Sequence, residues 1–156
     1  MDKTKKNLGS AEGSLIAIID IGTTFIRMII AERQLDGEVR ILEKTTQSVA
    51  IGRDIVAKKR ISARTVEQCI GALESYQRLL VEYGLTAADV RAVAPSVVRE
   101  ADNWEICFDR LSNATGFAFR LLDPGQVGYY YHLAFKSMIG GGGLKKAKTL
   151  CAKSAD

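Results

Sequence analysis

Several residue types are scarce in this chain, and each scarcity excludes a class of function. There are three cysteines, no C-x-x-C pair and one histidine, so a structural zinc site is not expected. An odd number of cysteines without a secretory signal predicts a reducing compartment, and we expect a cytoplasmic protein. The longest apolar runs fall short of the ~18 residues that a membrane span requires, so no membrane partner is expected.

Aromatic side chains are also sparse, at 7% of the sequence. The lysines gather near the two ends of the chain, and few aromatics stand among them. A platform on which nucleic acid bases stack is therefore not indicated, and no specific nucleic acid partner is expected. These lysine-rich ends, 1–13 and 139–156, are interpreted as flexible tails that flank one folded domain at 14–138.

What the chain does have is enough apolar material for a core, at 47% of its 156 residues, and a modest net charge of +4. Its most informative stretch is LIAIIDIGTTFIRMIIA at 15–31, which predicts two strands joined by a glycine turn. Asp20 ends the first strand, and Gly22 allows a tight turn. The hydroxyls and amides of Thr23 and Thr24 can face an anion, beside which Asp20 can hold a metal ion. The alternative is an ordinary hairpin.

The rest of the pattern predicts an α/β domain with a mixed sheet of about five strands and helices on both faces. Ser62 and Asp123 are expected to cap helices, with Pro124 in the first turn of the last one. Val39 and Ile41 are expected to point inward. The predicted elements are strands at 14–20, 24–32 and 38–46, a loop at 47–61, a helix at 63–82, a strand at 89–95, a helix at 102–115, a strand at 117–122 and a helix from 123 to about 138.

Arg99 is a candidate phosphate ligand because it follows the strand at 89–95, at the edge where such sheets bind ligands. Its guanidinium offers two parallel donors to phosphate oxygens. The alternative is a structural ion pair with Glu100 or Asp102. Ser96 can donate to the same phosphate or can instead cap a turn.

Several segments, in order and spacing, resemble the exopolyphosphatase / guanosine pentaphosphate phosphatase family of the actin-like ATPase superfamily. These segments are VRAVAPSVVREADN at 90–103, NATGFAFRLLDPGQVGYY at 113–130 and the stretch from IGRDI at 51–55 to RLLVEYG at 78–84. The resemblance covers about residues 14–135 and implies a ribonuclease-H-like half-domain with the element order βββαβαβα.

By this resemblance, Gly22, Thr23 and Thr24 form the first phosphate loop, with Ser96 and Arg99 as further phosphate ligands. The resemblance also implies a Mg²⁺ cofactor at Asp20, and polyphosphate or guanosine pentaphosphate as the partner. The activity that it implies is hydrolysis of terminal phosphoanhydrides.

Three departures from the family pattern concern catalysis. Pro95 stands where the family has threonine. Val127 occupies the position of the catalytic glutamate, with Gln126 beside it, and neither side chain is a general base. The glycines of IGGGGLK at 139–145 lack the Asp and Ser/Thr of the family's second phosphate motif, and a flexible linker is the alternative for them. We therefore expect a truncated family member without its second half-domain or its base, inactive alone.

Two other functions remain open at the level of sequence. One is a non-catalytic phosphate- or nucleotide-binding regulatory module, which the residues at 126 and 127 favour. The other is an actin-like cell-division or pilus-assembly ATPase, which the turn at 20–24 alone would fit. A second chain that completes the cleft, or a homodimer, is a candidate partner, and the sequence does not decide whether either forms.

Overall fold

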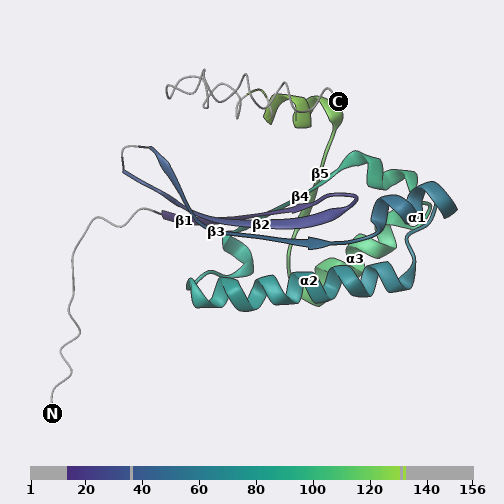
Figure 1. Ribbon diagram of the computed structural model, residues 1–156, viewed down its shortest axis with the longest axis horizontal. Helices are drawn as coiled ribbons and strands as arrows, with labels where there is room; N and C mark the ends of the chain where they lie inside the picture. Colours follow the sequence, from purple (N-terminus) through teal and green to yellow (C-terminus); the bar gives the residue numbers. More distant parts are fainter. Residues whose placement is uncertain (1–13, 36, 131, 133–156) are drawn as a thin grey trace, which may run out of the picture. The chain divides into compact units, whose positions relative to one another are not determined.

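The computed structural model describes residues 14–35, 37–130 and 132 (Figure 1). The chain divides into two compact units, Met1–Leu121 and Leu122–Asp156, and each is described by itself. The expected tails at 1–13 and 139–156 lie outside the described residues. No helix in the described ranges is long and apolar enough to cross a membrane.

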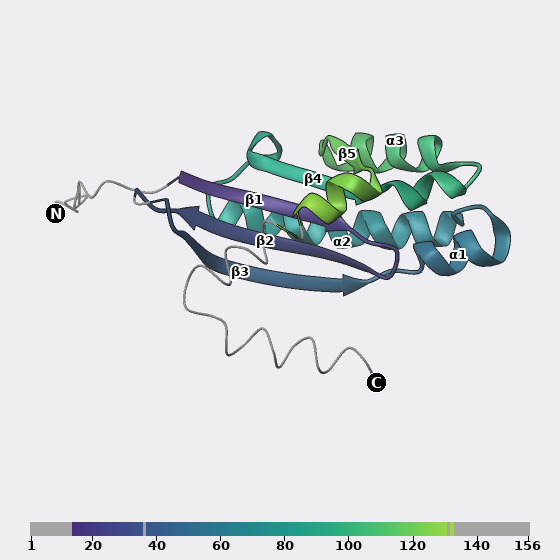
Figure 2. The same ribbon diagram turned by 90° about the horizontal axis from the view of Figure 1, so that it is seen from above.

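A five-stranded mixed sheet with the order β3-β2-β1-β4-β5 organises the first unit (Figures 1 and 2). β1 pairs antiparallel with β2 and parallel with β4, and β2 pairs antiparallel with β3. Gly37, at φ 87°, lies in the turn between β2 and β3. The strands are β1 (Ser14–Ile21), β2 (Phe25–Arg33), β3 (Val39–Ser48), β4 (Val90–Pro95) and β5 (Phe119–Leu122).

Two helices, α2 (Ala63–Glu82) and α3 (Trp104–Thr115), pack on one face of this sheet (Figure 1). Alternate strand residues face them, because side chains of a strand point to opposite sides in turn. The ends of both helices agree with the sequence: Ser62 caps α2 by accepting from the Thr65 N–H, and Gly116 ends α3 at φ 71°. The core between sheet and helices includes Ala17, Ile19, Ile21, Ile26, Met28, Ile30, Leu73, Tyr76, Phe108 and Leu111.

The inward orientation predicted for Val39 and Ile41 is wrong. Both lie on the edge strand β3, and they are 64% and 59% exposed. A bulge between Ile30 and Ala31 interrupts the β2–β3 register. β3 has a neighbour on one side only within this sheet, so alternation along it does not place its apolar side chains in the core.

The loop predicted at 47–61 is also wrong in its central part, which forms helix α1 (Ile51–Lys58). Ile51 and Ile55 are buried beneath this helix, and the carboxylate of Asp54 is buried with them. Asp54 accepts hydrogen bonds from the Ser62 N–H (2.9 Å) and the Thr65 hydroxyl (2.6 Å) at the start of α2. Contacts with a later part of the chain therefore stabilise α1. Two short 3₁₀ turns, η1 (Ala87–Asp89) and η2 (Ser96–Glu100), flank β4.

The second unit contains the helix that was predicted from Asp123 to about 138, and the structure describes it at 124–130; its predicted end near 138 lies outside the described residues. Asp123 accepts from the Gln126 N–H (2.8 Å), and the Gln126 side chain accepts from the Asp123 N–H (3.2 Å). This reciprocal pair is a capping box, so Asp123 is the N-cap as predicted.

Candidate phosphate-binding site

The turn between β1 and β2 is closed by a hydrogen bond from the Gly22 N–H to the Phe25 carbonyl (2.8 Å). A Cβ at position 22 would lie 3.0 Å from that carbonyl oxygen, which is closer than ordinary contacts allow. Glycine is therefore favoured at this position by the close approach of the two backbone segments. The turn presents Thr23 and Thr24 at the tip of the hairpin.

The segment at the start of α1 is hydrogen-bonded to this turn. The Val49 N–H donates to the Thr24 carbonyl, and the Gly52 N–H donates to the Thr23 carbonyl, each at 2.8 Å. A Cβ at Gly52 would lie 2.9 Å from Thr23 Cβ, so the backbone of α1 packs directly against the turn and leaves no room for a side chain at position 52. The sequence analysis missed this role of Gly52, and the only local signal was a glycine in an apolar stretch.

With both carbonyls bound on that side, the donors of the turn remain available. Within the described part of the chain, the amides and hydroxyls of Thr23 and Thr24 make no hydrogen bond. A row of free N–H and O–H donors at a tight turn is a concavity that suits an anion. The turn can therefore receive phosphate oxygens without breaking an existing contact.

Asp20 lies at the end of β1 on the sheet face opposite α2 and α3, where its neighbour across β2 is Arg27. The Arg27 guanidinium is 3.4 Å from the Asp20 carboxylate and also lies over the Phe25 ring, 5.4 Å from its centroid. No group of three Asp, Glu, His or Cys side chains gathers anywhere in the described ranges. One accessible carboxylate fits Mg²⁺ only in the common arrangement in which phosphates and waters supply the other ligands.

Arg99 lies at the same edge of the sheet as the turn. β1 and β4 are parallel neighbours, with Asp20 opposite Val93, so both strands end at this edge. The turn Gly22–Thr24 follows the first strand, and η2, which contains Ser96 and Arg99, follows the second. The topology thus brings to one edge the two segments that the sequence predicts to bind phosphate, although some seventy residues separate them.

The surroundings of Arg99 bear on the alternative roles proposed for it. Its guanidinium lies over the Trp104 ring, 5.6 Å from the centroid, and it forms no ion pair within the described part of the chain. Glu100 pairs with Lys59 instead, at 3.6 Å. Ser96 is the first residue of η2, and no side-chain cap is made there.

The cysteines of the first unit are poor candidates for a nucleophile. Cys69 of α2 and Cys107 of α3 are free and buried. Burial raises the pKa of Cys69 to about 12, and it raises the pKa of Cys107 although Arg60 and Arg110 lie nearby. Both thiols are therefore protonated near neutral pH and unreactive.

Comparisons with known proteins point in one direction, although no family model matches the chain. Exopolyphosphatase 2 of Mycobacterium tuberculosis is 30% identical over 115 residues, which are 72% of this chain and 34% of that protein. A bifunctional 3-dehydroquinate synthase/phosphatase of Fusobacterium nucleatum is 24% identical over 143 residues, 89% of this chain and 20% of that protein. The chain therefore spans about a third or less of these relatives.

Solved structures agree with the sequence relatives. The crystal structure of the Aquifex aeolicus member of the Ppx/GppA family superposes with a TM-score of 0.71 and 29% identity. The match covers 77% of this chain and 38% of that one. An exopolyphosphatase from Cytophaga hutchinsonii, at 21% identity and a TM-score of 0.65 over 72% of this chain, shows the same fold.

Proposed function

The chain is a relative of the exopolyphosphatase / guanosine pentaphosphate phosphatase family and fits the N-terminal half of its members, and on this premise we propose that it binds the terminal phosphates of polyphosphate or a related phosphoanhydride. In this proposal the chain forms one wall of a hydrolase cleft. The opposite wall would come from a second half-domain, in the same polypeptide or in another.

The observation that carries the proposal is the position and environment of Arg99. An exposed guanidinium, with no carboxylate partner among the described residues, lies at the sheet edge shared with the Gly22–Thr24 turn. The Trp104 ring orients the guanidinium but does not neutralise it, so both parallel donors stay available for phosphate oxygens. A guanidinium whose role was structural would be expected to pair with Glu100 or Asp102.

Each residue then has a defined part in binding. Thr23 and Thr24 donate hydrogen bonds to one phosphate, while Arg99 binds oxygens of the same or the next phosphate. Asp20 would hold a Mg²⁺ ion, which would neutralise phosphate charge when bound. Arg27 competes with the Mg²⁺ ion for the Asp20 carboxylate. The ion would therefore bind Asp20 only when phosphate oxygens complete the coordination of the ion.

Hydrolysis by this chain alone is not part of the proposal, because neither residue expected at the base position can accept a proton. Val127 has no lone pair, and the side chain of Gln126 is occupied by the capping box with Asp123. The capping box gives Gln126 a purely structural reason to be there. This favours, as a second candidate, a phosphate-binding module that does not hydrolyse its ligand.

Calorimetric titration of the chain with polyphosphate tests the proposal. Arg99→Ala should weaken binding by about 10- to 150-fold, the effect of removing a charged hydrogen bond worth ~1.5–3 kcal/mol. Arg99→Lys should recover only part of the loss, because an ammonium lacks the two-pronged donor geometry. Arg91→Ala is the matched control, since Arg91 lies near the other end of β4 and donates to the Ala88 and Val90 carbonyls. Equal affinity for the Arg99→Ala form and the parent would exclude Arg99 from the site.

A further inference from the structure

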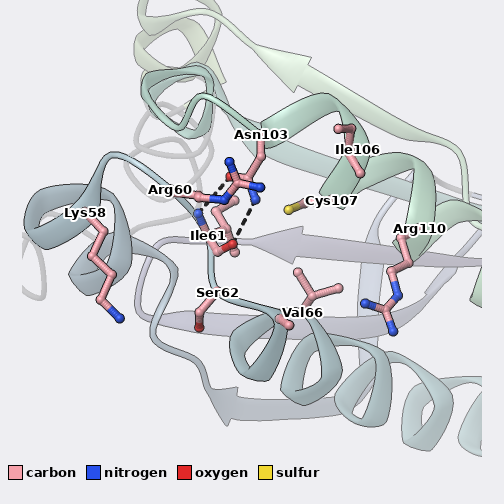
Figure 3. Close-up of a pocket in the computed structure, with 10 residues that line it drawn as sticks. Lys58, Arg60, Ile61, Ser62, Val66, Asn103, Ile106, Cys107 and Arg110 are labelled. Atoms are coloured by element: carbon pink, nitrogen blue, oxygen red, sulfur yellow. Dashed lines mark hydrogen bonds between the residues drawn. The ribbon is translucent and has the colours of Figure 1, made fainter.

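A pocket of about 370 Å³ lies where the end of α1, the start of α2 and the first turns of α3 meet (Figure 3). Its volume is within the roughly 300–1,000 Å³ typical of small-molecule sites. Arg60 and Arg110 lie on either side of Cys107 and Val66 in Figure 3, while Lys58 extends away from them. None of the functions described above uses this pocket.

The wall of the pocket carries positive charge that is only partly compensated. Its lining residues include Lys58, Arg60 and Arg110 and no carboxylate. Arg60 makes no ion pair with any described residue, whereas Arg110 pairs with Glu67 of α2. The thiol of Cys107 is neutral there, because burial raises its pKa. The pocket therefore presents cations around an uncharged floor, a combination that suits an anion.

Hydrogen bonds hold the main chain next to Arg60 in place. The Asn103 side chain accepts from the Ile61 N–H and donates to the Ile61 carbonyl, each at 2.9 Å, and Figure 3 shows this clamp beside Arg60. One residue later, the Ser62 N–H donates to buried Asp54. The main chain directly after Arg60 is thus held by hydrogen bonds to two other segments, so less conformational entropy is lost there when a ligand binds.

The same region connects to the phosphate-binding edge. Arg99 lies over the ring of Trp104, and Trp104 directly follows Asn103, which holds Ile61 next to Arg60. The Asp102 N–H also donates to the Lys59 carbonyl (2.8 Å). Arg99 and Arg60 therefore flank the start of α3 on neighbouring segments, and a long linear anion could contact both.

We propose that this pocket is a second anion site that takes an inner segment of a long polyphosphate chain whose terminal phosphates lie at the Gly22–Thr24 turn and Arg99. The inference rests on the proposed function for the identity of the ligand. It adds a preference for chain length: a ligand of three phosphates would occupy the edge alone, whereas a long chain would reach Arg60 and Arg110.

Affinities of the 156-residue chain for tripolyphosphate and for long-chain polyphosphate, both at low salt, test this preference. Arg60→Ala should weaken long-chain binding about fivefold, the upper end of the effect of one solvent-exposed charge pair, and leave tripolyphosphate binding unchanged. Glu67→Gln should tighten long-chain binding about twofold, because it releases Arg110. Glu74→Gln, two turns along the same helix and without an ion pair among the described residues, is the matched control.

Two results separate this inference from the proposed function. If Arg99→Ala weakens both ligands but Arg60→Ala weakens neither, the pocket is not a subsite and the proposed function stands. If Arg99→Ala changes neither affinity, the proposed function fails. The amide resonances of Val66 and Cys107 should shift on addition of long-chain polyphosphate but not of tripolyphosphate, and an absence of shift with the long chain would also overturn the pocket site.

Discussion

At the scale of the residue, the buried carboxylate of Asp54 has a measurable effect on stability. Burial acts to raise its pKa, but hydrogen bonds from Thr65 and Ser62, with a smaller contribution from Lys58, outweigh burial and lower it from 3.8 to about 2. A lowered pKa stabilises the folded state above the unfolded pKa near 3.8. That stabilisation is lost as the pH falls from about 4 towards 2.

Asp54→Asn should therefore destabilise the protein by about 2 kcal/mol near neutral pH, since each pKa unit corresponds to ~1.4 kcal/mol. The difference from the parent should shrink between pH 4 and pH 2, where the parent loses its own advantage. Urea unfolding at a series of pH values measures both. Asp109→Asn, an exposed residue of α3 without a hydrogen bond among the described residues, is the control. A constant difference at every pH would contradict the assignment.

Gly52 is the second residue whose role can be isolated. Gly52→Ala places a Cβ 2.9 Å from Thr23 Cβ, so the turn must shift. We expect a loss of ~1–3 kcal/mol in stability and at least tenfold weaker phosphate binding. Gly71→Ala in α2, where nothing lies within 4 Å of the new Cβ, should instead stabilise the protein by ~0.5–1 kcal/mol and leave binding unchanged. Equal phosphate affinity in the Gly52→Ala form, measured by titration, would show that the turn does not depend on this contact.

At the scale of the element, the sequence predicted the long helix α2 and the strand β4 well, but it missed the short helix α1. α2 is 20 residues long with a continuous apolar stripe and a serine cap, and its bounds agree with the prediction. α1 has eight residues, one of them glycine, and a buried aspartate interrupts its apolar face. Its stabilising partners, Thr65 and Thr23, are remote in sequence, so no local pattern could reveal it.

The same reasoning separates the parts of the site. The Gly22–Thr24 turn is a local feature and could be read from the sequence directly. The placement of Arg99 at that edge required the parallel pairing of β1 with β4, which strand order only suggested. Arg99 stacks on Trp104, and Glu100 forms an ion pair with Lys59. Both contacts depend on the path of the chain through η2, and the sequence carries no signal for either.

At the scale of the whole molecule, the chain spans about a third of the length of exopolyphosphatase 2. In our proposal it forms one side of a cleft, and a second half-domain forms the other side. We expect Val127→Glu alone to give no phosphatase activity. When a second half-domain that carries the family's second phosphate motif, D-x-G-G-G-[ST], is fused to the chain, the Val127→Glu form should release phosphate from polyphosphate at least ~10²-fold faster than the Val127 form. Equal rates in the two fusions would place the base elsewhere.

The parallel pairing of β1 with β4 also has a consequence for folding kinetics. β1 and β2 form a hairpin of residues close in sequence, whereas Asp20 and Val93 pair across β1 and β4 although some seventy residues separate them. Contacts between residues so distant in sequence close slowly. The turn can therefore form early, while affinity for phosphate, which also requires Arg99, should appear with the last step of refolding. A ligand that binds both segments would slow unfolding, because it ties together the two parts of the sheet that assemble last.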